Sequence, residues 1–547
     1  MAKHWRHVAS RTAGSAVRTA AAMTAVMTLG AATPPATYGN PILYADYSDP
    51  DVIRVGHDYY LVASSFHLSP GLPVLHSRDL VHWRIIGHVL PKLGFAPQYD
   101  MPGPFALDDS KSKPVTGTRY GGGVWAPAIR YHAGKFFVYW PTPDEGIFMA
   151  SAHRPEGPWS KPVQVIAGPG YEDPCPFWDD DGTAWLVHGR VGAGPLILHR
   201  MSTDGTRVLD SGRVIVEDKQ DLPVLEGPKL YKRHGWYYIF APIGGVDKGV
   251  EVALRARVIE GPYQWRVVLR QGDTPIEGPH QGGWVETPSG EGWFIHFNST
   301  GAFGRIDYLE PLRWQNDWPI IGKPIPGDTA GEPVDRWPMP DTGSPPTHDR
   351  LQASDDFLRP TLGLQWSWNH NPDDAAWSLA ARPGYLRLSA LPARHLVTAR
   401  DTLTQILQGP DARITTRVDI AHMADGERGG LSLFGVRPSW IGVVRTGTTS
   451  RITFASAGNE QPGPTVTGPA ILLRAVVAPD QTVRYSYSLD DGRSYQAIGG
   501  TIALARFSWW KGSRPALFTY NVLGKGGSID VDWFQVDHPW LATAGGD

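Results

Sequence analysis

One stretch decides the fold of this chain: EGPKLYKRHGWYYIF, residues 226–240. It places a carboxylate before a tight Gly-Pro, then a short strand, a turn at His234-Gly235, and a second strand rich in aromatic residues. The same pattern recurs four more times, with the last copy looser, at residues 49–64, 126–139, 173–188 and 280–297. This part of the chain is therefore predicted to consist of five copies of one unit.

The copies are predicted to be the blades of a five-bladed β-propeller over residues 35–338. Their spacing of roughly 50 to 75 residues is in the range of four-stranded propeller blades. The chain contains 62 glycines and 49 prolines, many turn residues for a helical protein, and 22 tryptophans and 20 tyrosines that suit sugar binding. These counts favour an all-β chain.

Composition sets further bounds. At 547 residues the chain is long for one core, which indicates two or more domains. Its formal net charge of −3 gives no argument for a nucleic-acid partner. The single cysteine, Cys175, excludes an internal disulfide and is expected to be a small buried residue.

Residues 1–34 are predicted to be an export signal. A basic start runs from Lys3 to Arg18, an apolar stretch follows at residues 19–29, and Gly30-Ala31-Ala32 offers small residues for cleavage. The apolar stretch is too short to span a bilayer, so no membrane partner is expected and the protein is expected to be secreted or periplasmic. The alternative is a disordered basic tail.

A second domain is predicted after the repeats. Residues 339–351 have the composition of a linker. Beyond them, short runs such as residues 412–418 and 483–488 alternate polar and apolar side chains, as half-buried strands do. Residues 352–542 are therefore predicted to form a β-sandwich of the jelly-roll or concanavalin-like kind.

The repeat also predicts a functional site. If the first strand of each copy is innermost, its leading residues ring the mouth of a central channel. Asp49, Asp173, Glu226 and His280 are then expected to converge from four blades. The alternative is that each acid only caps a turn, since Asp before Pro is common in turns. Three acids at matching positions favour a site.

Separated carboxyl groups point to glycosidic bond hydrolysis. In an inverting enzyme one carboxylic acid protonates the leaving oxygen, and a carboxylate roughly 6.5–9.5 Å away deprotonates a water. Asp49 is the candidate general base and Glu226 the candidate general acid. A general acid must hold its proton near neutral pH, and Asp173 is placed to supply the negative charge that raises its pKa.

Aromatic and histidine side chains complete the expected site. Trp125, at the mouth of the second copy, and Phe66, after the first, are candidate platforms for a sugar, with core packing as the alternative reading. His280 is a candidate ligand for a metal ion in the channel, directly or through water.

These motifs resemble those of glycoside hydrolase family 43, which contains β-xylosidases and α-L-arabinofuranosidases. The resemblance covers most of the mature chain and rests on residues 40–43, 47–56, 75–83, 123–127, 173–177 and 226–228. It implies a five-bladed propeller with a C-terminal sandwich and hydrolysis with inversion. It also implies that Asp49 is the base, Asp173 the residue that tunes and orients the acid, and Glu226 the acid.

The resemblance also implies a metal ion in the channel, and the chain departs from the family pattern at one position. The resemblance implies that His280 lies near a channel metal, often calcium, although no cofactor is required for the reaction. Many relatives carry a sugar-binding basic residue where this chain has Thr300, with Arg305 as the candidate substitute. The departure bears on which sugar is preferred more than on mechanism.

The function expected from the sequence is a secreted exo-acting hydrolase. It is expected to remove terminal xylose or arabinofuranose from plant polysaccharide fragments, its carbohydrate partner. The alternatives are a relative acting on arabinan or galactan, and a non-catalytic carbohydrate-binding propeller that would not need the three acids.

Overall fold

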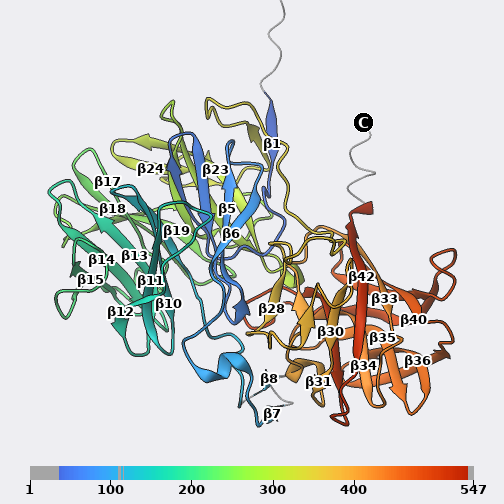
Figure 1. Ribbon diagram of the computed structural model, residues 1–547. Helices are drawn as coiled ribbons and strands as arrows, with labels where there is room; N and C mark the ends of the chain where they lie inside the picture. The colour runs from blue at the N-terminus through green and yellow to red at the C-terminus, as the bar shows by residue number, and fades with distance from the viewer. Residues whose placement is uncertain (1–35, 109–112, 115, 540–547) are drawn as a thin grey trace, which may run out of the picture. The chain divides into compact units, whose positions relative to one another are not determined.

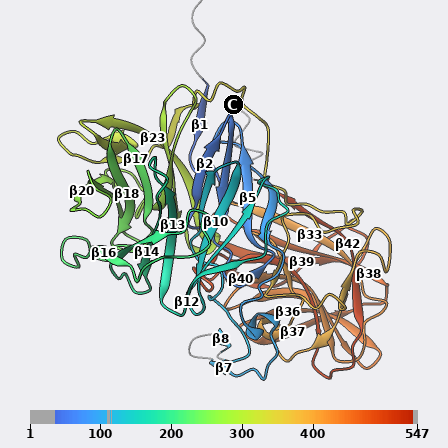
Figure 2. The same ribbon diagram turned by 60° about the vertical axis from the view of Figure 1, so that its left-hand side comes forward.

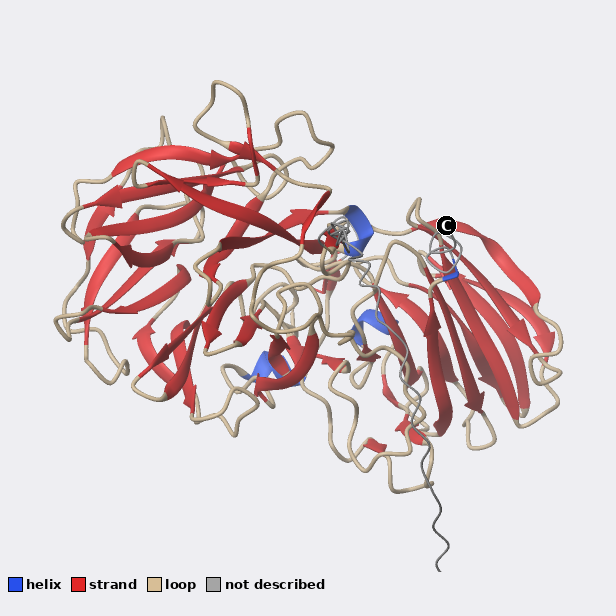
Figure 3. Cartoon of the chain, turned by 90° about the horizontal axis from the view of Figure 1, so that it is seen from above, coloured by secondary structure: helices blue, strands red, loops and turns tan. Residues whose placement is uncertain are grey.

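The computed structural model describes residues 36–539 except 109–112 and 115, so the predicted export signal lies outside the described residues. This part of the chain is all-β, as predicted (Figure 3). Its helical content consists of single 3-10 turns, η1 (Pro97–Asp100), η2 (Gly301–Phe303) and η3 (Leu396–Thr398). No helix in the described ranges has the length and apolar character needed to cross a membrane.

The repeats form five antiparallel blades, which confirms the predicted propeller (Figure 1). Blade 1 contains β2 (Asp51–Val55), β3 (Asp58–Val62), β5 (Gly71–Ser77) and β6 (Arg84–Leu90). Blade 2 contains β9 (Ala128–His132), β10 (Lys135–Thr142), β11 (Gly146–Ala152) and β12 (Val163–Ala167). Blade 3 contains β13 (Tyr171–Trp178), β14 (Ala184–Arg190), β15 (Leu196–Met201) and β16 (Arg213–Val216).

The last two blades complete the ring. Blade 4 contains β17 (Lys229–Arg233), β18 (Trp236–Ile243), β19 (Val250–Ala256) and β20 (Gln264–Leu269), and its sheet continues through β26 (Gly331–Glu332) and β25 (Lys323–Pro324). Blade 5 contains β21 (His280–Glu286), β22 (Gly292–Ser299), β23 (Arg305–Gln315) and β24 (Trp318–Ile321). The innermost strand β2 contacts both β9 and β21, so the ring closes between blades 5 and 1.

The chain segments on either side of the blades are also tied together. β1 (Thr37–Gly39) pairs with β27 (Arg336–Pro338), and Leu43 pairs with Asp307 of blade 5. A further short ribbon joins β7 (Leu107–Asp108) and β8 (Lys113–Pro114) in the long connection after blade 1. Residues 339–351, the predicted linker, contain no strand, and Thr347 donates its backbone N–H to Asp79 of blade 1.

Strand β18 shows why the aromatic strand of the repeat is largely apolar. Ile239 and Ala241 pack toward residues of blade 3 such as Val187, whereas Phe240 packs toward blade 5 residues such as Phe294. Successive side chains of a strand point to opposite faces, and each face of a blade is covered by a neighbouring blade. A propeller strand is therefore buried on both sides and loses the polar alternation of a half-buried strand.

The second domain is a sandwich of two sheets, as predicted. One sheet runs in the order β37 (Asn459–Thr465), β36 (Thr449–Ser456), β35 (Ser439–Thr446), β34 (Glu427–Phe434), β41 (Arg514–Asn521), β32 (Leu403–Thr404), β28 (Ser367–Asn369) and β4 (Leu68–Ser69), with β31 (Leu391–Pro392) beside β41. The other runs β29 (Trp377–Ser378), β30 (Leu386–Ser389), β42 (Ser528–Asp537), β33 (Ala412–Asp419), β38 (Ala470–Val477), β39 (Thr482–Ser488) and β40 (Gln496–Ala503).

The sandwich and the propeller share a sheet edge. Strand β4 belongs to the connection within blade 1, yet it pairs with β28 of the sandwich through Ser69 and Trp368. The sandwich core lies between its two sheets, where Leu431 and Ile441 of one sheet meet Ile414 and Leu473 of the other. Figure 2 shows the sandwich strands in yellow to red beside the loops of the early blades. The shared edge places a loop of the C-terminal domain close to the propeller mouth.

Candidate active site

The structure shows which residues are equivalent at the start of the five innermost strands, here called the strand heads. Their registers with the second strands place Pro50, Pro127, Pro174, Pro228 and Gly282 at one repeat position. The residue two places earlier, here called the first mouth position, is Ser48, Trp125, Glu172, Glu226 or His280. The residue one place earlier, the second mouth position, is Asp49, Ala126, Asp173, Gly227 or Gln281.

The second mouth position has an unusual backbone. Asp49, Asp173 and Gln281 have φ values of 57°, 53° and 39°, and Gly227 has 63°. Residues other than glycine rarely adopt this left-handed conformation, and where they do they cluster at functional sites. At Gly227 a side chain would also collide with Gln281, because an added Cβ would lie 2.8 Å from its side-chain carbons. The strand heads are therefore bent so that their side chains face the mouth.

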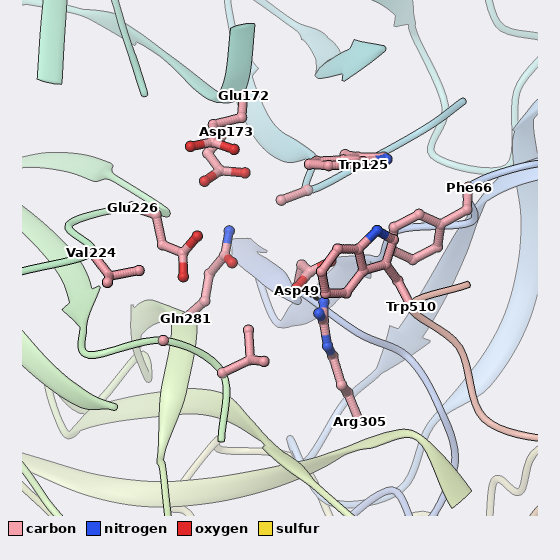
Figure 4. Close-up of a pocket in the computed structure, with 13 residues that line it drawn as sticks. Asp49, Phe66, Trp125, Glu172, Asp173, Val224, Glu226, Gln281, Arg305 and Trp510 are labelled. Carbon is pink, nitrogen blue, oxygen red and sulfur yellow. Dashed lines mark hydrogen bonds and ion pairs between the residues drawn. The ribbon is translucent and has the colours of Figure 1, made fainter. Parts of the chain in front are cut away.

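A cavity of about 260 Å³ lies at this mouth (Figure 4). Both mouth positions contribute to it, together with loops of blades 1 and 4, the first residue of β23 and one residue of the sandwich. Its lining residues are Asp49, Phe66, Trp125, Ala126, Glu172, Asp173, Val224, Glu226, Gly245, Val246, Gln281, Arg305 and Trp510. All the site residues predicted from the sequence except His280 thus line one cavity.

Asp49 is buried and tightly held. Arg305 Nη1 donates to Asp49 Oδ1 across 2.7 Å, and both side chains are only 6% exposed. Ser64 Oγ donates to the other carboxylate oxygen, Oδ2. Hydrogen bonds and a cation favour the ionised form of a carboxyl group, so Asp49 is in a setting that suits a proton acceptor.

Glu172, Asp173 and Glu226 form a cluster of three carboxyl groups, with one oxygen of each lying within 4.8 Å of the others. Burial, and then the charge of Glu226, raises the pKa of Asp173 to about 7, although Lys229 and the Gly227 N–H oppose the shift. Burial, and then the charges of Asp173 and Glu226, raises the pKa of Glu172 to about 9. Close carboxyl groups cannot all ionise, so the cluster retains protons at neutral pH and suits a proton donor.

His280 lies beneath this cluster rather than in the cavity wall. Its ring is buried, and Nε2 lies 3.1 Å from Glu226 Oε1. Calcium takes six to eight oxygen ligands, and no group of three metal-binding side chains in the described ranges includes His280. The calcium implied by the resemblance would therefore take its ligands other than His280 from water or backbone.

Aromatic rings form the wall opposite the carboxyl cluster. The Trp125 and Phe66 ring centroids are 6.3 Å apart, and Trp125 Nε1 donates to the Gly121 carbonyl across 2.8 Å. Trp510 of the sandwich meets Trp125 edge-on at 6.1 Å, and the Arg305 guanidinium lies 5.7 Å from the Trp510 ring centroid. Flat rings beside polar groups suit the alternating apolar and hydroxyl faces of a sugar.

Seven of the lining residues were not among the predicted site residues, and three of these seven have side chains suited to binding or catalysis: Glu172, Gln281 and Trp510. Glu172 was open to prediction, because aligning the copies on their prolines puts Glu172 level with Glu226. Gln281 is level with Asp49 only in the structural register, because the fifth copy has Gly282 in place of the proline. Gln281 Nε2 is buried without a hydrogen-bond partner within the described structure, and it faces the cavity (Figure 4). Trp510 gave no signal, since it comes from a sandwich loop whose place against the propeller depends on the tertiary structure.

A β-propeller whose small cavity joins carboxyl groups from separate blades to aromatic walls defines a class, the glycoside hydrolases. Comparison with known families agrees. Glycosyl hydrolases family 43 matches residues 38–319, and the beta xylosidase C-terminal concanavalin A-like domain matches residues 354–537. The chain belongs to glycosyl hydrolase family 43, and it is a glycosidase.

Individual relatives extend the match over nearly the whole chain. A putative beta-xylosidase of Xylanibacter ruminicola is 40% identical over 483 residues, 88% of this chain and 86% of the relative. A non-reducing end alpha-L-arabinofuranosidase of Bacteroides ovatus is 32% identical over 373 residues, 64% of this chain and 65% of the relative. A solved GH43 hydrolase, engineered to display both endo-xylanase and exo-arabinofuranosidase activity, is similar with a TM-score of 0.82 at 28% identity, covering 92% of this chain and 99% of that one.

Proposed function

We propose that the protein is an inverting exo-glycosidase that releases terminal β-D-xylose or α-L-arabinofuranose from plant hemicellulose fragments. The observation that carries the proposal is that Asp49 and Glu226, from blades 1 and 4, line one small cavity. The similarity to a β-xylosidase and to an α-L-arabinofuranosidase supports the two candidate sugars.

In the proposed reaction both proton transfers are made by side chains. Asp49 takes a proton from a water molecule, whose oxygen attacks the anomeric carbon of the bound sugar. Glu226 gives its proton to the leaving glycosidic oxygen as the bond breaks. Asp173 lies beside Glu226 and accepts the Gly227 N–H at 2.8 Å, so it both orients the strand head and helps the cluster keep its proton. The reaction needs no cofactor.

The size of the cavity supports exo action. Its volume of about 260 Å³ is below the range of roughly 300–1,000 Å³ typical of sites for drug-sized ligands, so it suits one sugar unit better than a chain. Trp510 narrows the mouth on the side of Trp125. We expect one terminal sugar to fill the cavity while the rest of the fragment extends into solvent.

The test combines substrate choice with stereochemistry. Nitrophenyl glycosides of β-xylose, α-arabinofuranose and β-galactose separate the proposed sugars from an arabinan- or galactan-type specificity. Proton NMR of the first product anomer then distinguishes inversion from retention. The proposal predicts pentose release with inversion, and it is wrong if the first product anomer keeps the configuration of the substrate or if neither pentoside is hydrolysed.

Export is proposed on the sequence of residues 1–34 alone. Fractionating cells of the source organism and probing with an antibody tests this. We expect the protein in the medium or periplasm, and recovery solely from the cytoplasm would contradict the proposal.

A further inference from the structure

A tight turn of the sandwich, residues 508–511, reaches the propeller beside Asp49. The Ser508 N–H donates to the Lys511 carbonyl at 2.7 Å, and the Lys511 N–H donates back at 3.1 Å. The two residues between them, Trp509 and Trp510, have φ values of 56° and 71°. Bulky residues rarely adopt this conformation, so the surroundings must hold the turn in place. The stacking of Trp509 on Tyr120, with centroids 3.9 Å apart, does so.

The last residue of this turn, Lys511, extends its side chain into the propeller. Lys511 is 3% exposed. Its Nζ donates to the Asp46 carbonyl at 2.9 Å, to Ser48 Oγ at 3.2 Å and to the Ser64 carbonyl at 3.3 Å. An ammonium group has three N–H donors, and each has an acceptor here, so the geometry suits the charged form.

The acceptors of Lys511 lie on both sides of Asp49. Ser48 directly precedes Asp49 at the strand head, and Ser64 Oγ donates to Asp49 Oδ2. The same turn reaches Asp46, whose Oδ2 accepts the Gly512 N–H at 2.8 Å, while Asp46 Oδ1 accepts the Arg305 N–H at 3.1 Å. One buried ammonium thus joins the two backbone segments that fix the Asp49 carboxylate.

The charges around this centre are mixed. The titratable groups that face Asp49 or Lys511 are Asp46, Asp173, Asp307, Arg305, Arg514 and His67. Burial raises the pKa of Asp307 well above its usual range, which favours its neutral form. Burial also lowers the pKa of Lys511, against the opposing effect of Asp46. Arg305, Lys511 and Arg514 are then the cations that lie near Asp46 and Asp49.

We propose that Lys511 is a positioning residue for Asp49: it braces Ser48 and Ser64 so that the carboxylate stays aimed at the cavity. The inference rests on the proposed role of Asp49 as the general base. It makes the C-terminal domain part of the machinery that activates water, in addition to its contribution of Trp510 to the cavity wall.

The test compares Lys511→Met, Lys511→Gln and Lys511→Arg. Met removes both charge and donors, Gln keeps an amide donor without charge, and Arg keeps the charge. We expect kcat/KM of the Met and Gln variants to fall roughly ten- to hundredfold, since misplacing a reacting group costs this much. The acid limb of the pH–rate profile moves up by about one unit, because a carboxylate that loses a nearby cation has a higher pKa. The Arg variant keeps the limb near its original pH.

Lys525→Met is the matched control, since Lys525 Nζ forms a 2.6 Å ion pair with Asp425 on the sandwich away from the site. Its profile is expected to coincide with that of the unmodified protein. A folded Lys511→Gln variant whose acid limb stays in place would overturn the inference. If the Lys511 variants do not fold, Ser48→Ala removes one acceptor of the brace with little change in volume. This variant is also expected to shift the acid limb of the pH–rate profile to higher pH. An acid limb at an unchanged pH rejects the inference.

The Asp49→Asn variant separates this inference from the proposed function. An inactive Asp49→Asn together with an unshifted Lys511→Gln rejects only the role of Lys511. A fully active Asp49→Asn rejects the role of Asp49 as base, and with it both statements. A double-mutant cycle of Ser64→Ala with Lys511→Gln adds a further check: effects on the acid limb that simply add would contradict a brace acting through Ser64.

Discussion

Arg305 and Asp49 join the fifth blade to the first through a 2.7 Å charge-assisted hydrogen bond at the point where the ring closes. Arg305 lies at the start of β23, the third strand of blade 5, and Asp49 at the head of β2. Both side chains are buried, so water screens the pair weakly. The contact ties the candidate base to the element that completes the propeller.

Replacing Arg305 with Gln is expected to disable the base. A carboxyl group that loses a nearby cation loses stabilisation of its charged form, so the acid limb of kcat/KM is expected to shift to higher pH and activity to fall about a hundredfold. Arg313→Gln on the same strand is the control, because Arg313 is exposed and lies over Trp337. A pH profile of Arg305→Gln that matches the control would contradict the prediction.

Glu226→Gln is expected to show the pattern of a lost general acid. Leaving groups that need protonation, such as the second xylose of xylobiose, react about a hundredfold or more slowly. Dinitrophenyl xyloside, whose leaving group needs no proton, loses far less. Steady-state rates on both substrates measure the difference. Equal losses on both would show that Glu226 does not donate the proton.

Asp173→Asn tests the carboxyl cluster. Asp173 and Glu226 lie within 4.8 Å of each other at their nearest oxygens, and the charge of Glu226 helps to raise the pKa of Asp173. Removing one charge lowers the pKa of the remaining acid, and the alkaline limb of kcat/KM moves down by about one unit. The profile is measured from pH 5 to pH 9 beside Asp180→Asn, an exposed acid of the same blade. A limb that stays in place or rises argues against the tuning role.

Glu172→Gln is expected to make stability less sensitive to pH. The pKa of Glu172 is about 9 in the folded protein and 4.5 as its ordinary value, so between these pH values the folded state keeps a proton that the unfolded chain loses. The free energy of unfolding therefore falls as pH rises through this window. A glutamine side chain has no ionisable proton, so the variant does not lose stability in this way as pH rises. Its melting temperature is expected to exceed that of the unmodified protein by about 2 °C at pH 8 and to equal it at pH 4. Calorimetry at both pH values checks the sign, and an equal difference at both refutes it.

Trp510→Ala is expected to weaken sugar binding. Removing this wall of the cavity takes away ring contact made in both the bound and transition states, so KM rises about tenfold while kcat changes little. Trp265→Ala, an exposed tryptophan on the outer strand of blade 4, is the control. Unchanged KM would mean that the sandwich does not contact the sugar.

The repeat made much of the fold predictable. Each blade head is local: Pro174 or Pro228 fixes the turn, and the next residues form a strand whose partner follows within a dozen positions. The candidate acids lie at these heads, so aligning the copies was enough to bring them together. Glu172 was missed because the copies were matched at Asp173. Glu172, one residue earlier, is the residue that corresponds to Glu226 of blade 4.

Local sequence was enough to predict that five similar units pack as blades and that acids lie at the start of three of them, because a strand–turn–strand pattern depends on neighbouring residues. The contacts of Asp49 with Arg305, and of Ser48 with Lys511, which lies 463 residues further along the chain, could be seen only in the folded protein. Such contacts depend on ring closure and on the packing of the sandwich against the propeller. They join segments that are far apart in the chain, and no repeated sequence pattern predicts which of these segments meet.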